Sequence, residues 1–535
     1  MYDCANIDAH STFGALTRSK IPLMNSPEPN ADALIDIVRQ LGAELHPARR
    51  TAVTLDSALD RDLGLDSLGR VELVLRLERR FDVHLPEATV VSAETPRDLL
   101  KAVLGAGPAE AAGAAISEPN RTLPGGAATP EHARTISEAL DWHLDAHPER
   151  IHITLTHESG PDEEISYAAL HEGAARVAAG LLERNLSPRA PVAIMLPTGT
   201  DYFYSFLGIL LAGGIPVPIY PPARPSQIED HMRRHAGILS NAQAQVLITM
   251  PEAKALALLL RSQVTSLSGV VTPADIVSGT AQHIHPAAKP DDIAFLQYTS
   301  GSTGSPKGVV LTHANVLANL NAMGRALEVD SSDVFVSWLP LYHDMGLIGA
   351  WLGSLYYGFR LVAMSPLTFL ARPQSWLRAI HRHAGTMSAA PNFAYQLCAR
   401  RIDERELEGL DLSSWRLAFN GAEPVSADTL DEFAARFGKY GLRRDAIMPV
   451  YGLAECTVGL AFPPLRRGPK IDRVDRNAFA NTGRAVPVDE AAGDALRFVA
   501  CGHPIPGHQI RIVDNAGREL PERAEGRLQF NGPSA

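Results

Sequence analysis

Three glycines, one lysine and several hydroxyl side chains are concentrated in residues 298–313 (YTSGSTGSPKGVVLTH). Apolar residues 293–296 before this segment predict a buried strand, and residues 314–320 after it predict the start of an amphipathic helix. Glycines let backbone N–H groups approach an anion closely, and a helix N-terminus favours negative charge. The segment therefore predicts a phosphate-binding loop. Its predicted ligands to a nucleotide are Thr299, Ser300, Gly301, Ser302, Thr303, Gly304 and Lys307.

This loop differs from the Walker A motif of ordinary P-loop NTPases. Five residues separate Gly301 from Lys307, Pro306 precedes the lysine, and Gly308 follows it where Walker A has serine or threonine. A flexible Gly/Ser linker is the alternative interpretation, but the strand and helix patterns on both sides favour a loop held in a folded domain.

Two further motifs follow the predicted phosphate loop in the sequence. Residues 420–424 (NGAEP) and 451–455 (YGLAE) follow it in order. The three motifs together resemble the core motifs of adenylate-forming enzymes, the superfamily of acyl-CoA synthetases, luciferases and peptide-synthetase adenylation domains. Residues 337–347 (SWLPLYHDMGL) and 390–397 (APNFAYQL) are similar to the fatty acyl-AMP ligase branch. The resemblance covers about residues 130–535.

The resemblance implies roles for the nucleotide-binding residues. The backbone of Gly421, Ala422 and Glu423 would lie along the adenine, and Tyr451 beside Gly452 offers an aromatic face for stacking. Glu455 would act in catalysis by holding Mg²⁺, a hard cation that prefers carboxylates and phosphate oxygens, with Thr303 as a second ligand. Taken alone, Tyr451 would be read as a core residue and Glu455 as a solvated one.

The resemblance also implies an acyl pocket. His343 would be catalytic, beside the acyl carboxylate, although a His-Asp pair such as His343 and Asp344 is more often structural. The predicted pocket residues are His343, Met345, Gly346, Asn392 and Phe393.

A second motif lies far upstream, in residues 62–68 (DLGLDSL). Apolar positions after it predict an amphipathic helix over residues 67–81 that begins at Ser67. The motif resembles the attachment site of acyl carrier proteins, which implies 4′-phosphopantetheine on Ser67; a plain N-cap serine is the alternative. Further helices expected near 31–45 and 96–104 complete a domain of the four-helix carrier type.

Composition excludes other classes. The chain has 535 residues, 45% hydrophobic and 20% charged, which suits a multidomain protein with several cores. A net charge of −11 argues against a nucleic-acid partner. Four scattered cysteines argue against a zinc site and for a reducing compartment, and neither a targeting segment nor a transmembrane segment is visible. We therefore expect a cytoplasmic protein.

Composition shifts predict the domain boundaries. We expect a disordered N-terminus over 1–28, a carrier-like all-α domain over 29–105 and a flexible linker over 106–130. Residues 131–535 are expected to form the large domain of the ligase, made of α/β layers with a small β subdomain at its C-terminal end.

Residues 463–500 are rich in Pro, Arg, Asp and Gly. They resemble the insertion of fatty acyl-AMP ligases, which hinders the domain rotation that admits coenzyme A; a solvated surface loop is the alternative. The end of the chain resembles the strand before the family's ribose-binding motif. The sequence thus predicts a chain without the small C-terminal domain and its catalytic lysine, and with impaired activity.

These patterns predict a ligase that uses ATP and Mg²⁺ to convert a fatty acid to acyl-adenylate and passes the acyl group to a phosphopantetheine thiol. The expected partners are a fatty acid, a phosphopantetheinyl transferase, its own or a partner carrier domain and a downstream acyl-accepting enzyme. An acyl-CoA synthetase and a non-catalytic carrier or docking module are the alternatives. Residues 343–346 (HDMG) disfavour an amino-acid-activating domain, which has a pocket aspartate there.

Overall fold

The computed structural model describes most of the chain between residues 29 and 535. The predicted disordered N-terminus, most of the predicted linker and residues 300–306 of the predicted phosphate loop lie outside the described residues. The described ranges are 29–45, 52–65, 67–83, 85–86, 89, 93–106, 128–157, 160–221, 228–277, 288–299, 307–489 and 493–535.

Three helices form an N-terminal domain with its own core: α1 (Ala31–Leu45), α2 (Ser67–Phe81) and α4 (Pro96–Gly105). α4 begins with a capping box, in which the Thr95 side chain accepts from the Asp98 backbone N–H and the Asp98 side chain accepts from the Thr95 backbone N–H. The buried apolar positions recur at helical spacing on each helix, as the sequence predicts. They include Leu34, Val38, Leu41, Leu73, Leu77, Leu99 and Val103.

The centre of the large domain is a seven-stranded sheet with the order β13-β12-β11-β9-β10-β1-β2. All neighbouring pairs are parallel except β1 with β2, so the other strands end at one shared carboxyl edge. The strands are β1 (Ile151–Leu155), β2 (Glu163–Ser166), β9 (Val334–Ser337), β10 (Arg360–Ala363), β11 (Met387–Ala390), β12 (Leu417–Asn420) and β13 (Ile447–Pro449).

A second parallel sheet has the order β4-β3-β5-β6. Residues 206–220 contain the end of α7 and the whole of the buried strand β4. The elements of this part are β3 (Pro191–Met195), β4 (Ile215–Pro218), β5 (Val246–Thr249), β6 (Gly269–Val271), α5 (Ile136–Ala146), α6 (Tyr167–Glu183), α7 (Thr200–Leu211), α8 (Ile228–Ala242), α9 (Pro251–Arg261) and α10 (Pro273–Ile276). No helix in the described ranges combines the length and the apolar character needed to cross a bilayer.

The predicted phosphate loop joins two strands, β7 (Ile293–Thr299) and β8 (Lys307–Thr312), which pair antiparallel. The predicted helix forms as α11 (His313–Leu327), but it follows β8 and not the loop. The expectation of a strand, a loop and a helix N-terminus in direct succession is therefore wrong. Residues 307–312 form a strand because a partly buried side chain at Val309 and a buried one at Leu311 alternate with exposed neighbours, the pattern of a half-buried strand.

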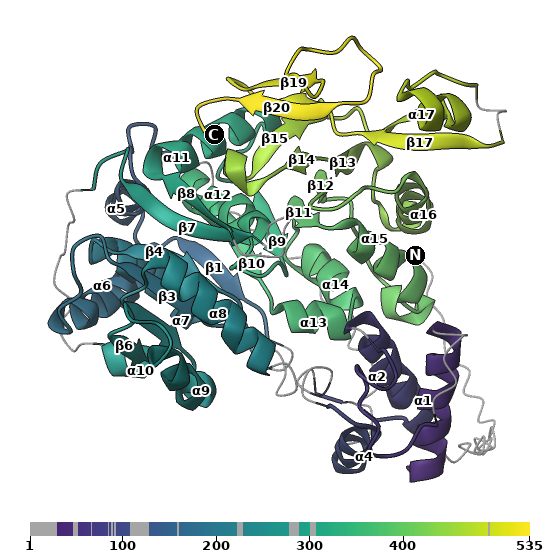
Figure 1. The fold of residues 1–535 in the computed structure, drawn as a ribbon, viewed down its shortest axis with the longest axis horizontal. Helices are drawn as coiled ribbons and strands as arrows, with labels where there is room; N and C mark the ends of the chain where they lie inside the picture. The colour runs from purple at the N-terminus through teal and green to yellow at the C-terminus, as the bar shows by residue number, and fades with distance from the viewer. Residues whose placement is uncertain are drawn as a thin grey trace, which may run out of the picture.

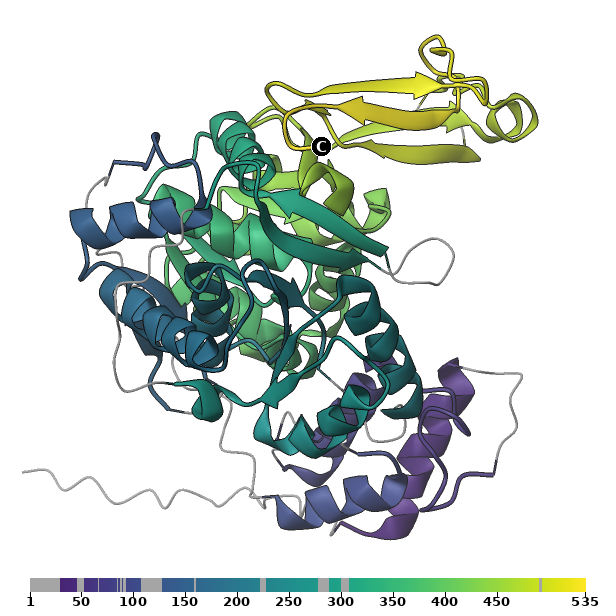
Figure 2. The same cartoon turned by 60° about the vertical axis from the view of Figure 1, so that its left-hand side comes forward.

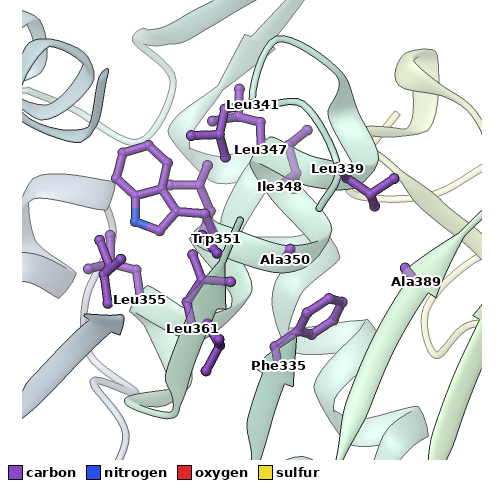
Figure 3. Close-up of a cluster of buried hydrophobic side chains, with 14 of the residues drawn as sticks. Phe335, Leu339, Leu341, Leu347, Ile348, Ala350, Trp351, Leu355, Leu361 and Ala389 are labelled. Atoms are coloured by element: carbon purple, nitrogen blue, oxygen red, sulfur yellow. The ribbon is translucent and has the colours of Figure 1, made fainter. Parts of the chain in front are cut away.

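Helices cover the two faces of the seven-stranded sheet. On one face lie α11, the π-helix η2 (Met345–Leu352) and α12 (Gly353–Tyr357). Figure 3 shows Trp351 of η2 among apolar side chains that include Phe335 of β9. The elements on and around the other face are α13 (Pro366–Ala371), α14 (Gln374–Arg382), α15 (Asn392–Arg401), η3 (Glu404–Leu407), α16 (Ala427–Phe437), η4 (Gly438–Tyr440) and η5 (Arg444–Ala446).

The C-terminal part consists of short antiparallel pairings beyond the carboxyl edge. The described residues 463–489 and 493–500 include two paired strands and a helix rather than only irregular loop. In Figures 1 and 2 the last strands lie at the opposite end of the molecule from the N-terminal helices. The elements are β14 (Tyr451–Gly452), η6 (Ala454–Cys456), β15 (Gly459–Phe462), β16 (Lys470–Asp475), α17 (Arg476–Thr482), β17 (Ala495–Ala500), β18 (His503–Pro504), β19 (Gln509–Val513) and β20 (Arg527–Asn531).

Candidate functional site

A cavity of about 550 Å³ lies between the seven-stranded sheet, α11, η2 and the β14–β15 segment. Part of its wall is polar and the rest is mostly apolar. The polar lining residues are Thr299, Lys307, His343, Asp344, Tyr451 and Glu455. A carboxylate or phosphate group and an apolar chain could therefore occupy the same cavity.

Thr299 and Lys307 stand opposite each other in the register of β7 and β8. They are the last and first residues of the two strands, so they flank residues 300–306, and both line the cavity. The structure thus places Thr299 and Lys307, the residues on either side of the predicted phosphate loop, in the wall of the cavity.

Tyr451 and Glu455 reach the cavity from one tight segment. Tyr451 in β14 pairs with Ala461 in β15, and its side chain is 38% exposed. A Cβ atom at Gly452 would lie 1.8 Å from the carbonyl oxygen of Val458, so only glycine allows the chain to fold back there. This fold-back places the aromatic ring and the exposed Glu455 carboxylate on one wall.

Of residues 421–423, only Ala422 lines the cavity. Its φ of 67° is left-handed, a conformation that costs free energy for a residue with a Cβ atom and is typical of functional sites. Glu423 is engaged elsewhere, because its Oε1 accepts a hydrogen bond of 2.6 Å from the Phe393 backbone N–H at the start of α15. Gly421 packs beside Val450, whose Cγ2 would be 2.9 Å from an added Cβ.

His343 and Asp344 form a close pair at the cavity wall. His343 Nδ1 lies 2.7 Å from Asp344 Oδ1, which also accepts from the Met345 backbone N–H at 2.7 Å. Burial alone would lower the pKa of His343, but the hydrogen bond and negative charge of Asp344 outweigh burial and raise the pKa above its ordinary value of 6.5. The pair therefore presents a positively charged donor to the cavity over a wider pH range than an isolated histidine would.

The predicted acyl pocket is only partly reproduced by the cavity wall. His343 and Met345 line it, whereas Gly346, Asn392 and Phe393 are not among its lining residues. Gly346 is buried, and an added Cβ would lie 2.4 Å from the Pro340 carbonyl oxygen. Asn392 Oδ1 accepts a hydrogen bond of 3.0 Å from the Ser426 backbone N–H. Their role in a substrate pocket stays a prediction.

Most of the apolar wall was not predicted from the sequence. Its residues come from α11, β9, α12, β11, β12 and β15, and no short motif connects them. One signal was available: Met345, Gly349 and Gly353 recur every fourth residue, which places them on one face of the helical segment formed by η2 and the start of α12. The unpredicted lining residues include Met323, Leu327, Phe335, Tyr357, Met387, Phe419 and Phe462.

Asn319 is a second functional candidate that the motifs did not show. Its buried side chain in α11 donates from Nδ2 to the carbonyl oxygens of Cys456 (3.2 Å) and Gly459 (2.8 Å), and to Ser534 Oγ (2.9 Å). Its Oδ1 accepts from the Gly459 backbone N–H at 3.1 Å. Asn319 thus fixes the segment that carries Glu455. An asparagine among the apolar positions of a helix is the only sequence signal of this role.

The predicted metal and attachment residues are placed in part. In the described ranges no three His, Cys, Asp or Glu side chains cluster as a metal site, but Mg²⁺ bound with phosphates needs only one or two protein carboxylates, which Glu455 can supply. The predicted ligand Thr303 lies outside the described residues. Ser67 is the first residue of α2, and the position of its side chain is not described.

Family comparisons agree with both parts of this architecture. Residues 140–535 match the family described as AMP-binding enzyme, and residues 36–103 match the family described as phosphopantetheine attachment site. The chain therefore belongs to the AMP-binding enzyme family, as its motifs predict.

Similar proteins include fatty-acid ligases. The medium-chain-fatty-acid–[acyl-carrier-protein] ligase TtuA of Teredinibacter turnerae is 33% identical over 426 residues, which are 69% of this chain and 65% of that protein. The long-chain-fatty-acid–AMP ligase FadD32 of Mycolicibacterium smegmatis is 36% identical over 368 residues, 67% of this chain and 57% of that protein. The chain spans less than two thirds of the length of these relatives.

Solved structures give the same result. A structure from a study of fatty acyl-adenylate ligases of E. coli and L. pneumophila aligns with a TM-score of 0.69 and 33% identity, covering 75% of this chain and 72% of that one. The L. pneumophila fatty acyl-adenylate ligase in complex with acyl adenylate and pyrophosphate aligns with a TM-score of 0.69 and 32% identity, covering 76% and 69%. These matches confirm the predicted resemblance to fatty acyl-AMP ligases.

Proposed function

We propose that this chain binds ATP and a fatty acid, forms or holds the acyl-adenylate, and passes the acyl group to a phosphopantetheine thiol carried on Ser67. The observation that carries the proposal is the cavity of about 550 Å³, whose wall combines polar groups with a larger number of apolar side chains. A fatty acyl chain attached to a nucleotide has the same two parts.

The polar lining residues of the cavity supply groups that would bind the nucleotide. The ring of Tyr451 offers a face for adenine and the left-handed backbone at Ala422 borders the same space. Lys307 and Thr299 lie where the triphosphate would pass residues 300–306. Glu455 would hold Mg²⁺, which supplies positive charge that stabilises the pyrophosphate leaving group.

His343 would orient the acyl carboxylate. With Asp344 raising its pKa, the imidazolium can donate a hydrogen bond to one carboxylate oxygen, which leaves the other free to attack the α-phosphorus of ATP. The new bond joins this oxygen to phosphorus, the bond from phosphorus to the bridging oxygen breaks, and pyrophosphate leaves. Because the carboxylate and ATP would be held next to each other, the entropic cost of bringing them together would be met on binding, which lowers the barrier of the reaction.

The N-terminal domain would carry the acceptor. Ser67 begins a helix of 15 residues, where the positive end of the helix dipole favours a phosphodiester. The phosphopantetheine group would supply a thiol that loses its proton and attacks the acyl carbon; the thioester forms, the bond from the acyl carbon to the phosphate oxygen breaks, and AMP leaves. We extend the proposal to a four-helix carrier domain over 29–105, a ligase domain over 131–535 with a small β subdomain, a phosphopantetheinyl transferase and a downstream acyl-accepting enzyme as partners, and a cytoplasmic location.

Coenzyme A is the alternative acceptor. A putative acyl-CoA synthetase of Caulobacter vibrioides is 32% identical over 374 residues. The ordered β16–α17–β17 arm in residues 463–500 supports the carrier thiol instead, because it resembles the insertion that disfavours coenzyme A.

The test is calorimetric titration with non-hydrolysable N-acylsulfamoyl adenosines of increasing chain length. Each methylene buried in the cavity adds about 0.8 kcal/mol, so affinity should rise about fourfold per methylene until the cavity is full. Tyr451→Ala should weaken all of them, while Tyr440→Ala, whose hydroxyl contacts Glu404 on the surface, should change none. An affinity that does not depend on chain length would contradict the proposal.

A further inference from the structure

The N-terminal domain contacts the large domain through α2. The carboxylate of Glu72 forms an ion pair with Arg401, the last residue of α15, and a second ion pair of 2.7 Å with Arg76 on its own helix. Only 8% of the Glu72 side chain is exposed. A carboxylate buried this deeply depends on its cationic partners, so Arg401 stabilises Glu72 in the docked arrangement.

A second contact lies further along α2. Arg372, which follows α13, donates from Nη2 to the Leu85 carbonyl oxygen at 3.3 Å and lies 3.7 Å from Glu78 Oε1. Leu370 and the buried Ala371 of α13 pack into the core cluster of the N-terminal domain. The contact therefore consists of a small apolar part, Leu370 and Ala371, and the polar contacts of two arginines, Arg372 and Arg401.

This contact lies behind the sheet as seen from the cavity. Met387 and Ala389 of β11 line the cavity, and Ser388 between them faces the other way, where its Oγ accepts from Trp376 Nε1 of α14 at 2.8 Å. The ring of Trp376 packs against Tyr395 of α15, so both helices cover this opposite face. In Figure 1, α13 and α14 lie between α2 and strands β9–β11. A helical layer and the sheet therefore separate α2 from the cavity.

The direction of α2 places Ser67 at the end of this helix that is further from the cavity. α15 begins at Asn392, just beyond the carboxyl edge of the sheet, and its 10 residues reach Arg401 about 15 Å away. Glu72 pairs with Arg401, whereas Glu78 is near Arg372. Arg372 follows the carboxyl end of β10 and α13 and precedes α14, the helix that leads back to the start of β11, so it lies on the side of the carboxyl edge. Ser67 precedes Glu72 by five residues, about 7.5 Å further along α2 and away from the edge where the cavity lies.

We propose that Leu370, Ala371, Arg372 and Arg401 form a holding site for the chain's own carrier domain, which keeps Ser67 away from the cavity until the domain leaves this surface. The proposal rests on the proposed role of Ser67 as the attachment site. The interface consists of a small apolar contact and two arginines, and a small interface between domains permits movement. Because both domains belong to one chain, the released carrier domain stays at an effective concentration of about millimolar relative to the ligase domain. It can therefore both leave the holding site and return to it.

Hydrogen exchange of the full chain tests the docking. Arg401→Glu should raise the exchange of α2 and α15 amides severalfold at low salt, and combining it with Glu72→Lys should restore protection. The matched control is Arg400→Glu, because Arg400 is the neighbouring residue of α15 and pairs with Glu432 at 2.9 Å instead of the carrier domain. Unchanged exchange in Arg401→Glu would overturn the docking.

The rate of acyl transfer tests the holding role. After phosphopantetheinylation, a synthetic acyl adenylate is added and the thioester is followed by intact-protein mass spectrometry. Release of the domain by Arg401→Glu should speed loading severalfold; slower loading would show that this surface is the transfer site and overturn the proposal. Absence of loading in every variant would overturn the proposed function, and the holding role with it, while exchange would still decide the docking.

Discussion

At the scale of single residues, Asp344 controls the chemistry that His343 offers to a carboxylate. Its carboxylate is held in place by the Met345 backbone N–H and raises the pKa of the imidazole against the opposing effect of burial. Because the pKa of His343 is raised in the folded chain, the pair stabilises the fold fully below pH 6.5. This contribution is lost as the pH rises through the raised pKa.

Asp344→Asn should lower the pKa of His343 below 6.5, since burial then acts without the compensating charge. The change is measured by NMR titration of labelled histidine rings, with His343→Gln used to assign the signal. Asp162→Asn is the control: it removes a carboxylate 3.5 Å from His383, away from the cavity, and should leave the His343 titration unchanged. An unaltered pKa in Asp344→Asn would show that Asp344 does not set the protonation of His343.

The sequence identified residues with distinctive local chemistry and missed those whose role depends on the fold. Tyr451, Glu455 and Lys307 belong to short motifs, and all three line one cavity. Asn319 holds the Glu455 segment across more than 130 residues of chain, and a buried amide looks like any other asparagine in a sequence. The sequence also did not show that the Glu423 side chain accepts a hydrogen bond from the Phe393 backbone N–H at the start of α15; the predicted role of the Glu423 backbone stays a prediction.

At the scale of elements, η2 shapes the apolar wall. A π-helix is rare and is frequently found at functional sites, and Met345 and Gly349 of this one line the cavity. A Cβ at Gly349 would meet no atom within 4 Å, so a longer side chain there would extend into empty space. The helix therefore leaves room that a substrate chain could fill.

Gly349→Leu should shorten the acyl chain that the cavity accepts. Each methylene displaced costs about 0.8 kcal/mol, so long-chain N-acylsulfamoyl adenosines should bind at least tenfold more weakly while the shortest keep their affinity. Gly438→Ala, another glycine whose added Cβ would meet no atom within 4 Å but which does not line the cavity, is the control. Equal weakening at all chain lengths would contradict this role of η2.

The β16–α17–β17 arm is tied to the large domain by charge. Arg497 of β17 forms ion pairs with Asp428 and Asp431 of α16, the second at 2.7 Å. The sequence predicted that residues 463–500 are an insertion, but not the paired strands, because their side chains show no clean alternation of buried and exposed positions.

Arg497→Ala should loosen this arm without unfolding the domain. Exposed ion pairs contribute about 0–1 kcal/mol each, so exchange of the β16 and β17 amides should rise severalfold while the global midpoint of thermal unfolding changes little. Arg476→Ala breaks the Arg476–Asp494 pair, which lies within the arm, and should leave β17 attached to α16. The same exchange in both variants would contradict the anchoring role of Arg497.

At the scale of the whole molecule, two domains with separate cores are joined by few contacts. The sequence predicted the helices of the first domain and the α/β layers of the second, because each depends on local periodicity. It did not predict that the phosphate loop joins an antiparallel pair, nor that Glu72 meets Arg401, since both depend on pairing across the fold. The local hydrophobic pattern predicts which residues form helices and strands. Their arrangement depends on contacts between segments that are far apart in the sequence, and no single segment shows those contacts.

Intact-protein mass spectrometry measures directly whether an acyl group passes from the cavity to a thiol carried on Ser67. The protein is treated with a phosphopantetheinyl transferase and coenzyme A, freed of both, and then given a synthetic acyl adenylate. If this transfer occurs, we expect one phosphopantetheine mass followed by one acyl mass, neither of them in Ser67→Ala, and slower acylation in Tyr451→Ala. Unmodified wild-type protein, or acylation that Tyr451→Ala leaves equally fast, would contradict it.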